Sequence, residues 1–315
     1  MNSERQIPSF PNLNNLPIQP RRLMAIAIVG AVIITGFVIL NVLRGIYTNW
    51  LWFDNLGHLD VYTKILSTRI WLFLAGFIAA ILVISLNFLW ANRSSKAGAS
   101  YSSTSSSSVN QIYRVVKLGI ILASLLISIV FAIIMSGRWE SILLFLNRSP
   151  FGQVDPILNT DASFYILTLP VLHLIQGWVL GLCIIIMLGV FVIYFVNYAI
   201  KGTALSLNPQ LISHMSAVGG VGLLVFALGH YLDIYELLFS TQGAAFGASY
   251  TDITAKQPGL YVLTFLAGVG GLLLIVSSLS TGLRFRLRII IATISFWFIA
   301  SILVGFIFPS AVQRF

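Results

Sequence analysis

LMAIAIVGAVIITGFVILNVL, residues 23–43, carries no charged side chain over a length that can cross a bilayer as one helix. A transmembrane helix needs about 20 consecutive, mostly apolar residues. Six further runs meet the same requirement, at residues 70–90, 118–136, 174–200, 212–232, 259–283 and 289–308. The sequence therefore predicts an all-α integral membrane protein with about seven transmembrane helices.

The composition of the 315-residue chain excludes a soluble globular protein. Hydrophobic residues make up 58% of the chain, charged residues only 9%, and the mean hydropathy is +0.94. A soluble domain carries about 25% charged residues, so lipid must be the solvent for most of these side chains. Cys183 is the single cysteine, which excludes an intrachain disulfide, and we expect it to be a packed core residue. The polar stretch before residue 23 is not typical of a cleavable signal peptide.

Basic residues set the expected orientation. With a cytoplasmic N-terminus, the inside segments carry eleven of the 18 lysines and arginines and the outside segments carry seven. This bias favours a cytoplasmic tail at residues 1–22, a transmembrane domain at residues 23–308 and an outside segment from residue 309. The net charge of +9 then reflects topology and anionic lipid, and no nucleic-acid partner is expected. The expected location is a bacterial inner or plasma membrane, with a thylakoid membrane as the alternative.

The predicted loops differ between the two sides. Residues 91–111 are rich in serine and nearly free of apolar side chains, which predicts a flexible inside linker. Outside, the aromatic-rich stretch 47–69 predicts an extended first span followed by a short helix on the membrane surface. In residues 136–148, the spacing of Trp139, Ile142, Leu143 and Leu146 predicts a second interfacial helix.

SPFGQVDPILNTDASFYILTLP, residues 149–170, follows that second helix on the predicted outer side. Pro150, Gly152 and Pro156 indicate a turn. Asp161, or Thr160 beside it, is placed to cap a helix that begins near residue 162. The segment SFYILTLP is too short to span, so we expect it to enter the outer leaflet and to bend at its final proline.

Four stretches of the chain carry a resemblance to a known family. They are WLWFDNLGHLDVYTKIL, FGQVDPILNTDASFYILTLP, GASYTDITAKQPGLYVL and the terminal FPSAVQRF. Together they resemble the amino-terminal membrane region of the uncharacterised protein family 0182, large bacterial multi-pass membrane proteins. The outer-loop residues that carry the motifs are Gly152, Asp155, Pro156, Asp161, Ser163, Phe164, Tyr165, Pro170, Tyr250, Thr251 and Asp252.

The resemblance implies that a large extracytoplasmic domain follows a segment like VQRF, so residues 309–315 are expected to begin an outer segment that is shorter than in the family. The chain is then a naturally short form, a fragment, or one half of a split protein whose outer half is a separate chain. It implies no established activity and no catalytic residues. We therefore expect no cofactor, and a non-enzymatic role is favoured over an enzymatic one.

Polar side chains near the outer face are the candidates for chemistry. His230, Asp233 and Glu236 would form one ridge if they lie on a helix, and such ligands can bind a divalent cation. Asp54 and His58, four residues apart, would share a helix face in the same way. The alternative is that these groups are interfacial caps and hydrogen-bond partners, and His173 would similarly bond a carbonyl freed by the proline bend.

Two further features favour structure over chemistry. Ser249 and Asp252 could suggest a nucleophile and a partner, but a turn in which Asp252 caps the next element explains them better. The pairs Gly219–Gly220 and Gly270–Gly271 could mark helix breaks as in transporters, but close helix packing is favoured.

The function hypotheses follow from this distribution of polar groups. The predicted span centres contain no acidic or basic residue, so we favour a membrane anchor or scaffold for an extracytoplasmic domain, or a subunit that docks onto a membrane complex. A channel or transporter subunit is the first alternative. An integral membrane enzyme or metal site at the outer face is the second.

Overall fold

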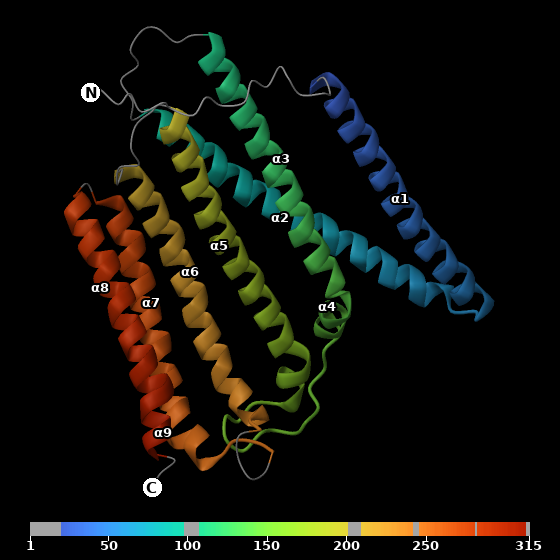
Figure 1. Cartoon of the computed structure of the whole chain (residues 1–315). Coiled ribbons are helices and arrows are strands. Elements are labelled where there is room, and N and C mark those ends of the chain that lie inside the picture. The colour runs from blue at the N-terminus through green and yellow to red at the C-terminus, as the bar shows by residue number, and fades with distance from the viewer. Residues whose placement is uncertain (1–19, 98–106, 201–208, 242–245, 281, 313–315) are drawn as a thin grey trace, which may run out of the picture. The chain divides into compact units, whose positions relative to one another are not determined.

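The computed structural model of the chain describes residues 20–97, 107–200, 209–241, 246–280 and 282–312 (Figure 1). Regular structure in these ranges is helical, apart from one isolated bridge between Val154 and Asp161. The α-helices are α1 (Pro20–Asn55), α2 (Leu59–Ala97), α3 (Ser107–Gly137), α4 (Trp139–Leu146), α5 (Leu169–Ile200), α6 (Pro209–Glu236), α7 (Gln257–Leu279), α8 (Leu283–Ile302) and α9 (Phe308–Val312). Short π-helices η2 (Phe164–Thr168), η4 (Asp252–Lys256) and η5 (Leu303–Ile307) and the 3-10 helix η3 (Leu237–Phe239) adjoin them.

The described residues contain 7 helical segments long and apolar enough to cross a membrane, which confirms the predicted number. Each segment contains all or most of one predicted apolar run. The chain divides into two compact units, residues 1–67 and residues 68–315, and each is considered by itself.

In the first unit, α1 ends in a Schellman motif. The His58 N–H donates to Phe53 O at 3.0 Å, the Gly57 N–H donates to Asp54 O at 3.0 Å, and Gly57 has a φ of 71°. Glycine is the usual residue at this left-handed position. The turn ends the helix between Asp54 and His58, so the prediction that these two side chains share one helix face is wrong. The predicted separate surface helix is also wrong, because residues 59–69 form the first turns of the continuous helix α2.

The core of the second unit lies between α2, α3, α5 and the start of α6. Buried side chains meet there from all four helices, including Ile84 and Phe88 of α2 and Val190 of α5. A Cβ atom on Gly189 would lie 2.1 Å from the Phe88 ring, so a glycine is needed to let this ring pack against α5. Cys183 is free and buried, as expected. In a bilayer such van der Waals packing, and not removal from water, holds helices together.

Polar side chains also link α2 to α5 and α6, near the C-terminal ends of α2 and α5 and the N-terminal end of α6. Asn197 Nδ2 of α5 donates to Asn92 Oδ1 at 3.1 Å and to Ser95 Oγ at 2.8 Å, both on α2. His214 Nε2 of α6 lies 2.8 Å from Asn87 Oδ1 of α2. Hydrogen bonds of this kind position helices in a membrane, and they fix α5 and α6 against α2.

Helices α6 and α7 approach each other through glycine. A Cβ atom on Gly220 would lie 2.7 Å from Gly271 O, and one on Gly271 would lie 2.8 Å from Gly220 O. Neither position tolerates a side chain without separating the two backbones. The prediction that the glycine pairs serve close helix packing is confirmed for these two residues.

Several predicted boundaries need correction. Helix α2 continues through Ala97 and α3 begins at Ser107, so only residues 98–106 of the predicted linker are not helical, and they lie outside the described residues. The last of the long apolar helical segments continues through η5 and α9 to Val312, so residues 309–312 are helical. Helix α1 begins at Pro20, inside the predicted tail, and residues 1–19 lie outside the described ones.

The segment before the fourth span is also continuous with it. Residues 164–200 form one helical run, in which η2 leads directly into α5. The Leu169 N–H donates to Phe164 O across five residues. This wider π turn immediately precedes Pro170, which has no N–H to donate. The prediction that SFYILTLP is a short segment separated from the fourth span by a bend at Pro170 is therefore wrong.

Helix α4 is present where a short helix was predicted. It contacts α5 and η2, and the Arg69 guanidinium lies 5.2 Å from the centre of the Trp139 ring. Trp139, Ile142 and Leu143 are partly covered, whereas Leu146 is 67% exposed. The helix thus packs along one face.

Candidate functional site

Two of the four family stretches, FGQVDPILNTDASFYILTLP and GASYTDITAKQPGLYVL, begin at one end of the second unit, here called the loop end. It comprises residues 147–168, 237–241, 246–256 and 303–312, which precede α5 and α7 and follow α6 and α8 (Figure 1). The polar candidates from the sequence, apart from Asp54 and His58, lie at or near this end.

Asp161 organises the loop between α4 and η2. Its carboxylate accepts hydrogen bonds from the N–H groups of Phe151 at 3.0 Å, Gly152 at 2.9 Å and Ser163 at 2.8 Å. The bond from Ser163 is the predicted N-cap, and the helical residues begin at Ala162 as expected. The two bonds to residues 151 and 152 were not predicted. They tie the start of the loop to its end.

Asp155 performs the same task within the loop. Its two oxygens accept from the N–H groups of Ile157 and Leu158, both at 2.8 Å. Oδ2 also accepts a hydrogen bond from the Tyr165 hydroxyl at 3.0 Å. The phenol of the SFY motif is thus a donor to the aspartate of the DP motif, ten residues earlier in the chain.

The hydrogen bonds keep both aspartates ionised. A hydrogen bond from the Ser163 side chain, followed by those from the Phe151 and Ser163 N–H groups, lowers the pKa of Asp161 from 3.8 to about 2. Burial is the largest single influence on Asp155 and raises its pKa. The hydrogen bonds from Ile157, Leu158 and Tyr165 together outweigh that effect, so the pKa of Asp155 is lowered from 3.8. Each carboxylate is therefore a structural anion whose acceptor sites are filled from its own loop.

Aromatic side chains join this loop to the end of α6. The Phe164 and Tyr165 rings lie 4.8 and 6.1 Å from the Tyr235 ring, and the Tyr165 ring lies 5.9 Å from the Phe239 ring. Tyr165 is buried together with Leu169 and Leu232. The SFY motif residues therefore pack the loop against α6 and η3.

The GASYTD motif forms a capping box at the start of η4. The Asp252 N–H donates to Ser249 Oγ at 3.2 Å, while Asp252 Oδ2 accepts from the Ser249 N–H at 2.9 Å and from its hydroxyl at 2.7 Å. Reciprocal bonding of this kind satisfies two N-terminal donors. The expected capping role of Asp252 is corrected in one respect: Ser249 is the cap residue and Asp252 its reciprocal partner. Asp252 is fully buried, and Lys256 Nζ lies 2.7 Å from its Oδ1.

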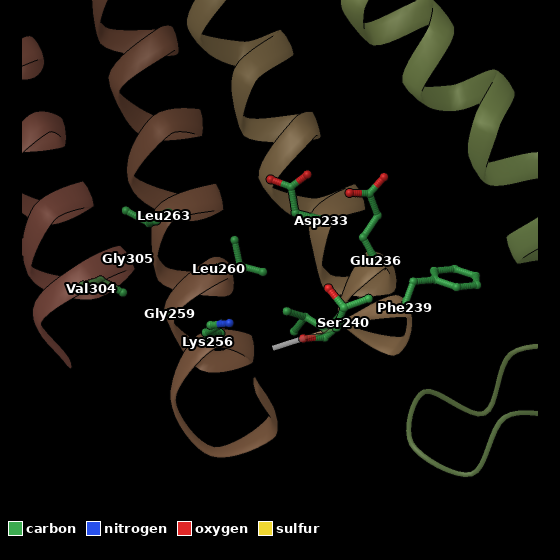
Figure 2. A pocket seen from close by; sticks show the side chains of 12 residues that line it. Asp233, Glu236, Phe239, Ser240, Lys256, Gly259, Leu260, Leu263, Val304 and Gly305 are labelled. Carbon is green, nitrogen blue, oxygen red and sulfur yellow. The ribbon is translucent and has the colours of Figure 1, made fainter. Parts of the chain in front are cut away.

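A pocket of about 410 Å³ opens at the loop end between α6, η3, α7 and η5. Figure 2 shows the carboxylates of Asp233 and Glu236 projecting from the last turns of α6, with Lys256 across the pocket. Leu260, Leu263 and Val304 line its apolar side. Sequence reasoning missed this pocket, because its walls come from segments about 70 residues apart.

Of the three residues that the sequence predicted to form one ridge, Asp233 and Glu236 cluster together and His230 does not join them. Asp233 and Glu236 are joined by His173 of α5, and the ligand atoms of these three residues all lie within 4.8 Å of one another. His173 Nε2 lies 3.1 Å from Glu236 Oε1. His173 was expected to bond a backbone carbonyl, and this expectation is wrong for Nε2.

His230 takes a different position. Its Nδ1 lies 3.6 Å from Asp233 Oδ2, and its ring packs edge-on against Phe226 at 5.0 Å. The ring centre is 6.2 Å from that of Trp297. His230 therefore lies beside Asp233 beyond hydrogen-bond distance, and it is absent from the set that clusters with Glu236.

Comparison with known proteins places these motifs in a family. The sequence model of the Uncharacterised protein family (UPF0182) matches residues 25–315. A UPF0182 protein of Clavibacter michiganensis subsp. michiganensis (strain NCPPB 382) is 34% identical over 297 residues, covering 92% of this chain and 29% of that protein. A UPF0182 protein of Salinibacter ruber (strain DSM 13855 / M31) is 32% identical over 251 residues, covering 75% of this chain and 26% of that protein.

The relatives are much longer than this chain. A UPF0182 protein of Paenarthrobacter aurescens (strain TC1) is 28% identical over 309 residues, which cover 95% of this chain and 30% of that protein. The chain thus spans about three tenths of the length of the curated relatives that it matches. No solved structure matches it.

Proposed function

The chain belongs to the uncharacterised protein family UPF0182, and from that premise we propose that its seven helices form a membrane domain that anchors and orients an extracytoplasmic region. The domain lies in the bacterial inner or plasma membrane, or in a thylakoid membrane, with the N-terminus in the cytoplasm and the loop end outside. Lipid surrounds the helices. The extracytoplasmic region belongs either to the same polypeptide or to a separate chain that docks onto the loop end.

One observation supports this proposal: the motif residues of the loops before α5 and α7 are ordered by hydrogen bonds within those loops. Asp155, Asp161 and Asp252 each direct their carboxylates to donors within their own loops. Tyr165 fastens one loop to the end of α6. A loop that is ordered by its own hydrogen bonds loses little entropy when a partner binds it, so it suits a docking surface.

The distribution of charge supports the orientation. Arg93 and Lys117, near the ends of α2 and α3 remote from the motif loops, line a surface pocket of about 570 Å³. Arg284, Arg286 and Arg288 begin α8, also away from the loop end. Basic residues at this membrane face are typical of the cytoplasmic side.

A domain replacement tests the proposal in a longer relative. In the Clavibacter protein, the region aligned with this chain is exchanged for one unrelated transmembrane helix of the same orientation. We expect the remaining region to stay membrane-bound, to lose its defined orientation and to become sensitive to added protease. If it instead migrates on native gels with the same partners and the same protease resistance as the unchanged protein, the anchoring and orienting role is wrong.

A further inference from the structure

We propose that the loop end binds a divalent transition-metal ion through His173, Asp233 and Glu236, at the edge of the pocket between α6 and α7. The proposed ligands are one imidazole from α5 and two carboxylates from α6. This site is independent of the anchoring role, and each can fail without the other.

The geometry brings three ligand atoms from two helices to one point. All three ligand atoms lie within 4.8 Å of one another, which is close to the separation of ligand atoms that bind the same metal ion. Ligand atoms at 2.0–2.2 Å from Zn²⁺ lie about 3 to 4.4 Å apart. A small rotation of a carboxylate therefore brings the three ligand atoms to distances that fit one ion. Asp233 and Glu236 are three residues apart on α6 and project to the same side (Figure 2).

The second observation is that one imidazole nitrogen of His173 lacks a hydrogen-bond partner. His173 Nε2 is buried and satisfies no hydrogen bond, although Glu236 Oε1 lies only 3.1 Å away. A distance that short without hydrogen-bond geometry means that the in-plane direction from Nε2, along which either a hydrogen or a lone pair lies, does not point straight at Glu236 Oε1. A buried ring nitrogen beside two carboxylates is suited to donate its lone pair to a cation, which would satisfy all three groups at once.

Ligand type selects the class of metal. Oxygen ligands alone favour Mg²⁺ or Ca²⁺, whereas an imidazole favours Zn²⁺ and its neighbours in the first transition row. One imidazole and two carboxylates therefore fit Zn²⁺, Mn²⁺ or Fe²⁺. His230 Nδ1 lies 3.6 Å from Asp233 Oδ2, so a second imidazole lies next to the proposed ligand set without being part of it.

The site is open on the side of the pocket. The side chains of Asp233 and Glu236 are 44% and 55% exposed, and that of His173 is 25% exposed, so an ion can enter from water. Three protein ligands leave further coordination positions free, as in sites where a metal holds water or an exogenous group. Asp233 and Glu236 also line the 410 Å³ pocket, whose other polar lining residues include Ser240 and Lys256.

Equilibrium dialysis of the untagged full chain in detergent against Zn²⁺ tests the proposal, after removal of bound metal with a chelator. We expect one Zn²⁺ per chain and binding at least about tenfold weaker in Glu236→Gln and in His173→Gln. The matched controls are Glu140→Gln on α4 and His58→Gln in the turn after α1, which remove the same groups elsewhere and should bind as the unchanged protein does.

Folding is checked by a second readout. A ligand that binds only the folded chain raises its melting temperature, so Zn²⁺ should stabilise the unchanged protein and both controls but leave Asp233→Asn unaffected. The proposal is overturned if the unchanged protein retains no Zn²⁺, if Glu236→Gln and His173→Gln bind as tightly as it does, or if the two controls weaken binding equally.

Discussion

At the scale of single residues, the loop-end aspartates act on their own backbone. Asp161 accepts from three N–H groups and Asp155 accepts from two N–H groups and the Tyr165 hydroxyl. The hydroxyl of Tyr165 therefore has a structural task that phenylalanine cannot perform. A hydrogen bond to a charged acceptor contributes about 1.5 kcal/mol or more.

We predict that Tyr165→Phe lowers the free energy of unfolding by about 1.5 kcal/mol, because the buried ring stays while the hydroxyl's hydrogen bonds, chiefly the one to the ionised Asp155, are lost. The measurement is the melting temperature of the detergent-solubilised chain. Tyr250→Phe is the control, since that tyrosine is 77% exposed and should have no effect. Equal melting temperatures for Tyr165→Phe and Tyr250→Phe would contradict the prediction.

The lowered pKa of Asp161 predicts a pH dependence of the loop. The carboxylate has a pKa of about 2 in the folded chain, against 3.8 in the unfolded chain. Its stabilising effect is therefore complete above pH 3.8 and is lost as the pH falls through about 2. Hydrogen exchange of residues 147–163, corrected for intrinsic rates, should therefore show protection that disappears in this window. Asp161→Asn should lack the protection at every pH, and a pH profile identical to that of the unchanged chain would refute the assignment.

At the scale of elements, the capping box at Ser249 sets where the helix of the sixth span begins. We predict that Ser249→Ala costs about 1 kcal/mol of stability, because it removes the cap oxygen and one donor to the buried Asp252. Chemical denaturation in mixed micelles measures the cost. Thr254→Ala on the same helix, whose hydroxyl bonds only to its own turn at Tyr250 O, should cost much less.

The contact between α6 and α7 offers a prediction with an internal control. Gly271→Val must push α7 away from Gly220 O, which would lie 2.8 Å from a Cβ atom, whereas a Cβ atom on Gly268 meets nothing within 4 Å. Overpacking of this kind costs about 1–3 kcal/mol. Gly271→Val should lower the melting temperature and Gly268→Val should not. Equal effects from the two variants would mean that the close approach does not stabilise the pair.

Prediction from sequence succeeded for elements that depend on local patterns. Charge-free runs such as residues 23–43 indicate helices, and Asp161 before a helical segment indicates a cap. It failed where distant segments meet. Nothing local indicates that His173 lies beside Glu236, 63 positions later, or that Asp161 reaches back to Phe151. Prediction also failed where a turn interrupts a periodic pattern, as Gly57 does between Asp54 and His58.

At the scale of the whole molecule, the anchoring role predicts which surface touches protein and which touches lipid. Phe246 and Tyr250 are 75% and 77% exposed at the loop end, where bulky aromatic side chains suit contact with another protein surface. Phe265, on α7, is 68% exposed along a span and should face lipid. The two kinds of exposed aromatic residue therefore have different neighbours in a membrane.

Photo-crosslinking in native membranes distinguishes those neighbours. A photoreactive phenylalanine analogue placed at Phe246 or Tyr250 should give protein adducts whose peptides belong to an extracytoplasmic region, either of a UPF0182 protein or of a separate docked chain. The analogue at Phe265 should give lipid adducts, since a lipid-facing position contacts acyl chains. Replacing Asp161 by Asn should reduce the loop-end adducts by disordering the neighbouring loop while leaving those at Phe265 unchanged. Lipid adducts at all three positions would mean that the loop end faces the bilayer and contacts no protein. That result would contradict the proposal that the loop end anchors an extracytoplasmic region.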